Sequence, residues 1–139
     1  MGLDMYAYAT KHKPAREVDF DTPRDIEEAW EVVKASDYKA DSPEFFYWRK
    51  HPNLHGWMHR LYEEKGGQSE HGFNGDNLVL TLADLVRLEA DVLTNSLPST
   101  SGFFFGESTR EDFEDDLEFI KLAREKIAEG KTVYYTSSW

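Results

Sequence analysis

The 139-residue chain contains no cysteine. Disulfide bonds and zinc sites built on thiolates are therefore excluded, and the composition fits a reducing compartment. Long hydrophobic runs are also missing, because no uncharged window approaches the roughly 20 residues that span a bilayer. The first residues lack a basic leader followed by an apolar run. We therefore expect a cytoplasmic protein with no membrane segment.

Positive charge is scarce as well, because 16 Lys and Arg residues stand against 27 Asp and Glu residues, for a formal net charge of −11. Such a charge argues against direct binding to nucleic-acid phosphates and suits a basic partner. The chain is nevertheless 40% hydrophobic and 14% aromatic, which is ample for a packed core. A single domain covering residues 1–139 is expected.

The two ends of the chain carry clear strand patterns. Apolar and polar residues alternate from Leu3 to Thr10, and β-branched and aromatic residues fill Thr132 to Thr136, so these segments are expected to pair. Capping residues and helical spacing indicate four or five helices, with starts near positions 22, 44, 53, 82 and 110 and an interruption at Pro52. We predict an α+β domain in which these helices surround an aromatic core and a small sheet joins the terminal strands.

Three consecutive phenylalanines, Phe103, Phe104 and Phe105, lie between two glycines in the connection before the last helix. An exposed loop of this composition would present a large aromatic surface, which marks either a buried loop or a binding site. The side chains could plug the core or form one wall of a ligand pocket. Ser101 precedes them, but no His and Asp framework supports a nucleophilic serine.

The main concentration of positive charge is Arg49, Lys50 and His51, which follows the aromatic Trp48. Cations beside planar rings can hold an anion by charge and stack against a flat group. His51 could also exchange a proton near neutral pH. The alternative is that these cations pair with the protein's own acids, which are in excess.

His51, His55 and His59 follow one another at intervals of four residues. On one continuous helix the first and last would be about 12 Å apart along the axis, too far to share one zinc ion. At most an adjacent pair could ligate, and we predict no metal site. The alternative role is the packing of partly buried histidines against aromatic residues.

Six of the eight residues from 111 to 118 are acidic. Acidic residues stabilise the first turn of a helix through its dipole, but this number exceeds what capping requires. The run is expected to form either an acidic surface that docks on a basic groove or a solvated helix face. As a docking surface, its principal residues are Glu111, Asp112, Asp115 and Asp116.

Four blocks of sequence occur together in a recognisable order: residues 1–6 (MGLDMY), residues 47–51 (YWRKH), residues 97–106 with the phenylalanine loop, and residues 134–139 (YYTSSW). In this order they resemble a family of small proteins from bacteriophages and prophages. The resemblance implies an accessory protein made inside an infected bacterium, and it carries over no established activity. The chain departs from the family pattern at Pro52 and after Gly106.

We predict that the protein binds and modulates a host or phage macromolecule, most simply a protein, through its acidic surface. The alternative is a small-ligand protein that binds or processes a nucleotide-like anion in a basic and aromatic pocket. The residues expected to line that pocket are Asp4, Tyr6, Trp48, Arg49, Lys50, His51, His55, Ser101, Phe103, Phe104 and Phe105. The sequence identifies no cofactor and leaves open whether a reaction is catalysed.

Overall fold

The computed structural model describes residues 3–11, 13–20, 44–49, 51–69, 72–98 and 110–139. The side chains of Glu44, Arg110 and Glu111 lie outside this description. Two predicted features also lie outside it, namely the helix expected from position 22 and the loop that contains Phe103 to Phe105.

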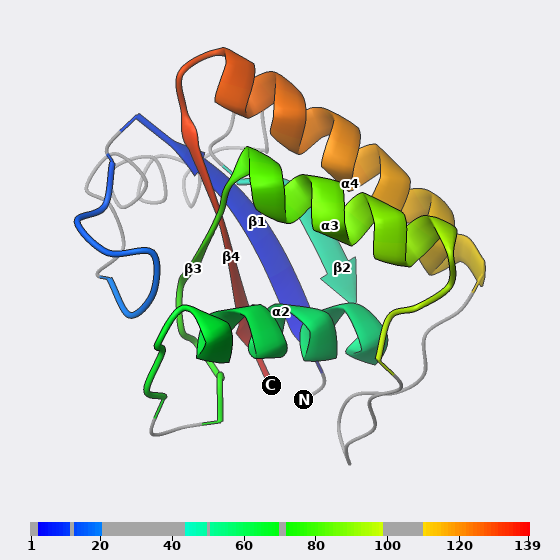
Figure 1. The fold of residues 1–139 in the computed structure, drawn as a ribbon. Coiled ribbons are helices and arrows are strands. Elements are labelled where there is room, and N and C mark those ends of the chain that lie inside the picture. The colour runs from blue at the N-terminus through cyan, green and yellow to red at the C-terminus, as the bar shows by residue number, and fades with distance from the viewer. Residues whose placement is uncertain (1–2, 12, 21–43, 50, 70–71, 99–109) are drawn as a thin grey trace, which may run out of the picture.

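Four antiparallel strands form one sheet in the order β2-β1-β4-β3. The strands are β1 (Asp4–Thr10), β2 (Glu44–Arg49), β3 (Leu78–Leu80) and β4 (Thr132–Ser138), and the described helices are α2 (Pro52–Glu64), α3 (Leu82–Leu93) and α4 (Arg110–Ala128). The helices lie on one face of the sheet, with α3 and α4 side by side and α2 near the chain termini (Figure 1). The predicted α+β class and aromatic core are confirmed.

Three details of the predicted fold differ from the structure. The described ranges contain three helices rather than four or five. The aromatic segment that follows Pro43 forms strand β2 instead of a helix, because its large rings suit a pleated surface and its backbone pairs with β1. Pro52 begins α2 and does not interrupt a helix. N–H groups in the first turn have no acceptor within the helix, so the N–H that proline lacks is not needed there.

Strands β1 and β4 bring the two ends of the chain together in the middle of the sheet. Their register runs from Asp4 opposite Ser138 to Thr10 opposite Thr132, which confirms the predicted pairing of the terminal segments. Side chains alternate between the two faces of each strand. Met5 and Ala7 are therefore buried under the helices, whereas their neighbours on β1 point to the other face.

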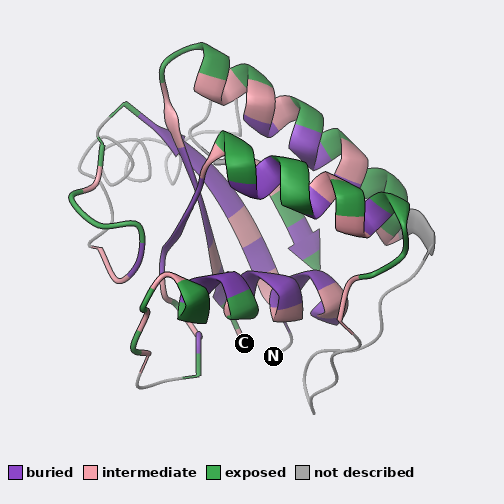
Figure 2. Ribbon diagram, viewed as in Figure 1, coloured by how far each residue is buried: buried purple, intermediate pink, exposed green. Residues whose placement is uncertain are grey.

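Aromatic rings join the helices to the sheet. Phe119 of α4 packs edge to face against Trp48 of β2, with ring centroids 4.7 Å apart. Phe73, from the connection between α2 and β3, lies 4.7 Å from the Tyr62 ring of α2 and 5.8 Å from the Tyr135 ring of β4. All five rings are buried, so these contacts form the continuous core between the two layers (Figure 2).

The face of the sheet away from these helices carries a second, smaller aromatic cluster. Tyr8 and Tyr134 stack with ring centroids 5.2 Å apart, and Phe20 contacts Tyr134 edge to face at 5.2 Å. Val79 and Tyr6 complete the cluster. The sheet is therefore apolar on both faces in its described part.

The outer edge of β3 is covered by the chain's own N-terminal region. Val18 forms an antiparallel bridge with Leu78, and the Val79 N–H donates to the carbonyl of Glu17 at 2.8 Å. An uncovered edge strand would offer these groups to another chain. This contact also fixes residues 13–18 beside the start of α3.

Gly67 is predicted to tolerate no side chain. A Cβ atom at this position would lie 2.3 Å from ring carbons of Tyr62, which is 1% exposed and donates its hydroxyl hydrogen bond to Asp19. We expect Gly67→Ala to lower the free energy of unfolding by about 1–3 kcal/mol through overpacking, measured by urea denaturation. In a Tyr62→Leu background the same substitution should cost much less; an equal cost in both backgrounds would contradict the contact.

Candidate functional site

The ligand pocket predicted from the sequence is divided by the sheet. Asp4 lies opposite Arg49 in the β1–β2 pair, on the face away from the helices, whereas Trp48 belongs to the helix face. His51 and His55 are buried with Trp48 on that helix face. The remaining predicted lining residues, Lys50, Ser101, Phe103, Phe104 and Phe105, lie outside the described residues. The expectation that Asp4, Arg49 and the histidines converge on one pocket is therefore wrong.

On the face away from the helices, the predicted residues form a patch of phenols and one carboxylate. Tyr47 donates a hydrogen bond to Asp4 Oδ1 at 2.5 Å, and its ring lies 5.3 Å from that of Tyr6. Desolvation and then this hydrogen bond raise the pKa of Tyr47 to about 12. The Tyr47 phenol therefore stays protonated and hydrogen-bonded to the Asp4 carboxylate. Arg49, which lies opposite Asp4 on β2, is exposed.

His51 is the centre of a buried polar cluster between α2 and α4. Its Nε2 lies 2.8 Å from Asp116 Oδ2, and its Nδ1 lies 3.7 Å from Asp112 Oδ2. Burial raises the pKa of Asp116, and the hydrogen bond to His51 opposes that rise. The Trp48 indole also lowers the pKa of Asp116. The two groups do not form a hydrogen bond of good geometry, because Trp48 Nε1 and Asp116 Oδ1 are both buried without a hydrogen-bond partner among the described residues. The cluster joins the N-terminal end of α2 to α4.

This cluster corrects the predicted acidic docking surface. Asp116 is 1% exposed and Asp112 has a side chain 14% exposed, because both face His51 rather than solvent. Asp115, between them in sequence, is exposed on the outer side of α4. The side chain of Glu111 lies outside the description. The prediction that Asp116 lies on the surface is wrong. When six of eight successive helix residues are acidic, at least one of them falls on the side of the helix that faces the core, and here that residue is Asp116.

His55 is packed among aromatic rings, as the non-metal interpretation of the histidines predicts. Its Nδ1 lies 2.7 Å from the Tyr135 hydroxyl, and its ring stacks on Phe73 at 5.3 Å and meets Trp139 edge to face at 4.9 Å. Burial, followed by the charge of His59, lowers the pKa of His55 to about 3. His55 is therefore neutral at physiological pH and serves the core.

The three histidines do not share a helix, because α2 begins after His51. His59 is half-exposed and lies 3.5 Å from Glu63 on the same helix. Among the described residues no group of three or more His, Asp or Glu side chains is arranged to hold a metal ion.

The outward side of α3 is apolar. Leu82, Val86 and Leu93 have exposed fractions of 52%, 58% and 59%. At 3.6 residues per turn they fall within about 40° of one another, so they form a single line that we call the α3 stripe. Leu85 and Leu88 are fully buried and belong to the core, so α3 carries both buried and exposed positions along its length (Figure 2). A surface helix normally presents charged residues at the positions that the α3 stripe occupies.

Helix α4 adds acidic side chains beside this stripe. Arg124 of α4 pairs with Glu89 of α3 at 2.9 Å, and helical spacing puts Glu89 next to Leu82 and Leu93. The α3 stripe therefore borders α4, which runs antiparallel beside it (Figure 1). Acids exposed on the outward side of α4 include Glu114, Glu118 and Glu125, which helical spacing puts within about 40° of one another; we call these three the α4 acidic row, and Lys121 is exposed beside them.

No protein-family model matches the chain, and comparison with curated proteins and with solved structures finds no match either. None of the described helices is both long enough and apolar enough to cross a membrane.

The sequence prediction missed the α3 stripe and Glu125, whereas Glu114 and Glu118 lie within the acidic run that it identified from 111 to 118. The sequence groups Leu82, Val86 and Leu93 with the other apolar residues of the helix, as one set. A signal was present, because six apolar residues in a 12-residue helix cover more than one side of it. Counting the angular spread of the set would have identified an exposed apolar line.

Proposed function

We propose that this protein binds a second protein through the α3 stripe and the neighbouring α4 acidic row. The observation that carries the proposal is the exposure of three large aliphatic side chains, each more than half exposed, in one line on α3. Contiguous apolar surface of this kind is typical of interaction sites, because the centres of interfaces are depleted of charge.

The chemistry of the surface favours a basic amphipathic helix as the partner segment. Such a helix would place its apolar side on the α3 stripe and its Lys or Arg side chains beside the α4 acidic row. The chain's net charge of −11 would also speed the encounter with a basic partner and make it sensitive to salt. Under the resemblance to phage and prophage proteins, the partner would be a host or phage protein that this chain modulates.

The proposal can be tested with a fluorescent amphipathic peptide built from Leu and Lys, titrated with the protein and followed by anisotropy. We expect saturable binding that weakens at high salt. Val86→Ser with Leu93→Ser should weaken it by about tenfold, since two apolar contacts of about 0.8 kcal/mol or more each would be lost. A peptide of the same composition without amphipathic order should bind much more weakly.

A matched pair of charge reversals separates local from general electrostatics. Glu118→Lys removes one member of the α4 acidic row, and Glu63→Lys makes the same change at an exposed position on α2. Only the first should weaken peptide binding by several fold. Equal effects of the two reversals, or an affinity unchanged by Val86→Ser with Leu93→Ser, would contradict the proposed surface.

A further inference from the structure

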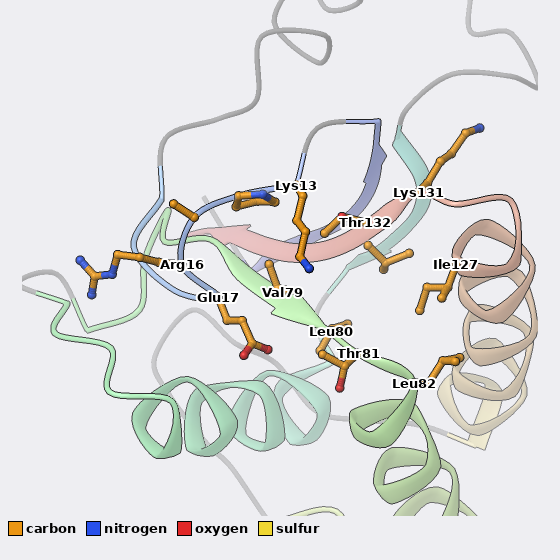
Figure 3. Close-up of a pocket in the computed structure, with 13 residues that line it drawn as sticks. Lys13, Arg16, Glu17, Val79, Leu80, Thr81, Leu82, Ile127, Lys131 and Thr132 are labelled. Carbon is orange, nitrogen blue, oxygen red and sulfur yellow. The ribbon is translucent and has the colours of Figure 1, made fainter.

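A hollow of about 530 Å³ lies where β3 leads into α3 and where α4 leads into β4 (Figure 3). Its walls are formed by residues 13–17, by residues 79–82, and by Ile127 with residues 131–133. This volume lies within the range of sites that hold small organic molecules. The hollow contains none of the residues that the sequence predicts to bind a ligand.

The inner surface of the hollow is apolar. Leu80 and Val133 line it from adjacent strands on the helix face of the sheet and are 1% and 0% exposed, while Val79, 8% exposed, lies at the sheet edge on the other face. Ile127 of α4 and Leu82 of α3 stand at its side (Figure 3). A ligand would therefore gain by placing an aliphatic or aromatic body here.

The rim of the hollow is basic, against the charge of the chain as a whole. Lys13 extends toward Val79 into the middle of the hollow, whereas Arg16 and Lys131 extend outward at its margins (Figure 3). The one acid among the lining residues, Glu17, already accepts a hydrogen bond from Lys65 at 2.8 Å.

Lys131 is held by Glu129 at 3.2 Å. Within the described part of the chain, neither Lys13 nor Arg16 has an ion-pair or hydrogen-bond partner. As far as the structure describes the chain, these two cations therefore stay uncompensated beside a hollow with apolar walls.

We propose that this hollow binds an organic anion with an apolar body, whose carboxylate, phosphate or sulfonate group meets Lys13, while Arg16 adds positive charge at the margin. The apolar body would lie against Leu82 and Ile127, whose side chains are still open to solvent, and the charged group would lie at Lys13. Cations that are free before binding need not break an internal ion pair, so the full charge-assisted contact is available to the ligand. Leu82 belongs both to the hollow and to the α3 stripe, but Val86 and Leu93 do not line the hollow, so variants at these two positions separate this inference from the proposed protein partner.

The test uses the fluorescent anion anilinonaphthalene sulfonate and its uncharged relative N-phenylnaphthylamine. We expect the anion to bind the native protein at one site and the uncharged probe to bind about tenfold more weakly or worse, which corresponds to the loss of one charge-assisted contact. Lys13→Gln with Arg16→Gln should weaken binding of the anion by about tenfold and leave the uncharged probe unchanged. Both positions are exposed, so these variants should remain folded.

Three control variants locate the site. Lys121→Gln removes an exposed cation from α4, outside the hollow, and should leave the affinity unchanged. Val86→Ser, in the α3 stripe, should also have no effect. Ala15→Phe should fill the hollow from its exposed wall and abolish binding, with the thermal midpoint retained.

Displacement of the bound probe distinguishes the possible head groups. Naphthoate and naphthyl phosphate share the aromatic body and differ in the anion, so the stronger competitor identifies the preferred head group. Equal binding of the charged and uncharged probes would overturn the proposal. Binding unaffected by the Lys13 and Arg16 substitutions, or retained in Ala15→Phe, would overturn it too.

Discussion

Replacing Asp116 with alanine is expected to lower the free energy of unfolding by about 3–5 kcal/mol, as measured by urea denaturation at neutral pH. The substitution removes the partner of a buried histidine, because His51 Nε2 lies 2.8 Å from Asp116 Oδ2 and both residues are at most 2% exposed. His51 would then lose its closest carboxylate partner while its ring stays buried, and Asp112 lies farther away, at 3.7 Å from Nδ1.

The neighbouring residue supplies the control. Asp115→Ala makes the same chemical change one position away on α4, where the side chain is exposed, and should alter stability by about 0.5 kcal/mol or less. The double variant His51→Ala with Asp116→Ala should lose less than the two single variants together, because no buried partner is left stranded. Similar losses in Asp115→Ala and Asp116→Ala would show that the buried pair does not form.

Acidification should destabilise the protein through His55. Its pKa is lowered from 6.5 to about 3 in the folded protein, so the unfolded chain binds a proton more readily throughout that interval. The stabilisation is complete above pH 6.5, declines as the pH falls, and is lost below about pH 3. At about 1.4 kcal/mol per pH unit, the His55 contribution amounts to about 5 kcal/mol, an order-of-magnitude figure.

The measurement compares urea unfolding of the native protein and His55→Gln between pH 7 and pH 3. Glutamine can still hydrogen-bond the Tyr135 hydroxyl but does not titrate, so the stability difference between the two proteins should shrink as the pH falls. The other groups facing His55 are His59 on its own helix and the rings of Phe73 and Trp139.

Asp116 works in the opposite direction, because its raised pKa makes the folded protein bind a proton more readily. That effect is common to the native protein and to His55→Gln, so it cancels in the comparison. His59→Gln should change the pH dependence much less than His55→Gln, because the charge of His59 is the smaller of the two causes that lower the pKa of His55. A stability difference between native and His55→Gln that stays constant across the interval would contradict the burial of His55.

The sequence predicts the α+β fold where local signals and tertiary packing agree. The Thr81 capping box with Asp84 is present, and the terminal strands pair in full. The prediction failed at β2, where Ser42 and Pro43 imitate a helix start but the aromatic run that follows is taken up by the sheet. Pairing with β1 overrides the local signal there, because large rings gain more from packing on the core than from a cap.

The sequence predicts which kinds of residue the candidate site contains better than it predicts where those residues lie in the fold. Arg49 and His51 are only two residues apart in the sequence. Because β2 ends at Arg49, the two side chains nevertheless lie in different surroundings: Arg49 is exposed and His51 is buried. Lys13 and Arg16 gave no signal, because a hollow formed by three separate segments is invisible in a local pattern. Only tertiary structure identifies cations that lack an internal partner.

The position of β4 between β1 and β3 has a consequence for biosynthesis. β4 follows the other three strands and the described helices along the chain, so it is synthesised after them, and the pairing of Asp4 with Ser138 is delayed until then. Before that point β3 has no strand that links it to the β1–β2 pair, and closing the sheet joins residues more than 100 positions apart. Chains that stop before β4 would expose the apolar face of an incomplete sheet to chaperones and proteases, whereas chains that include β4 would bury it in a late step.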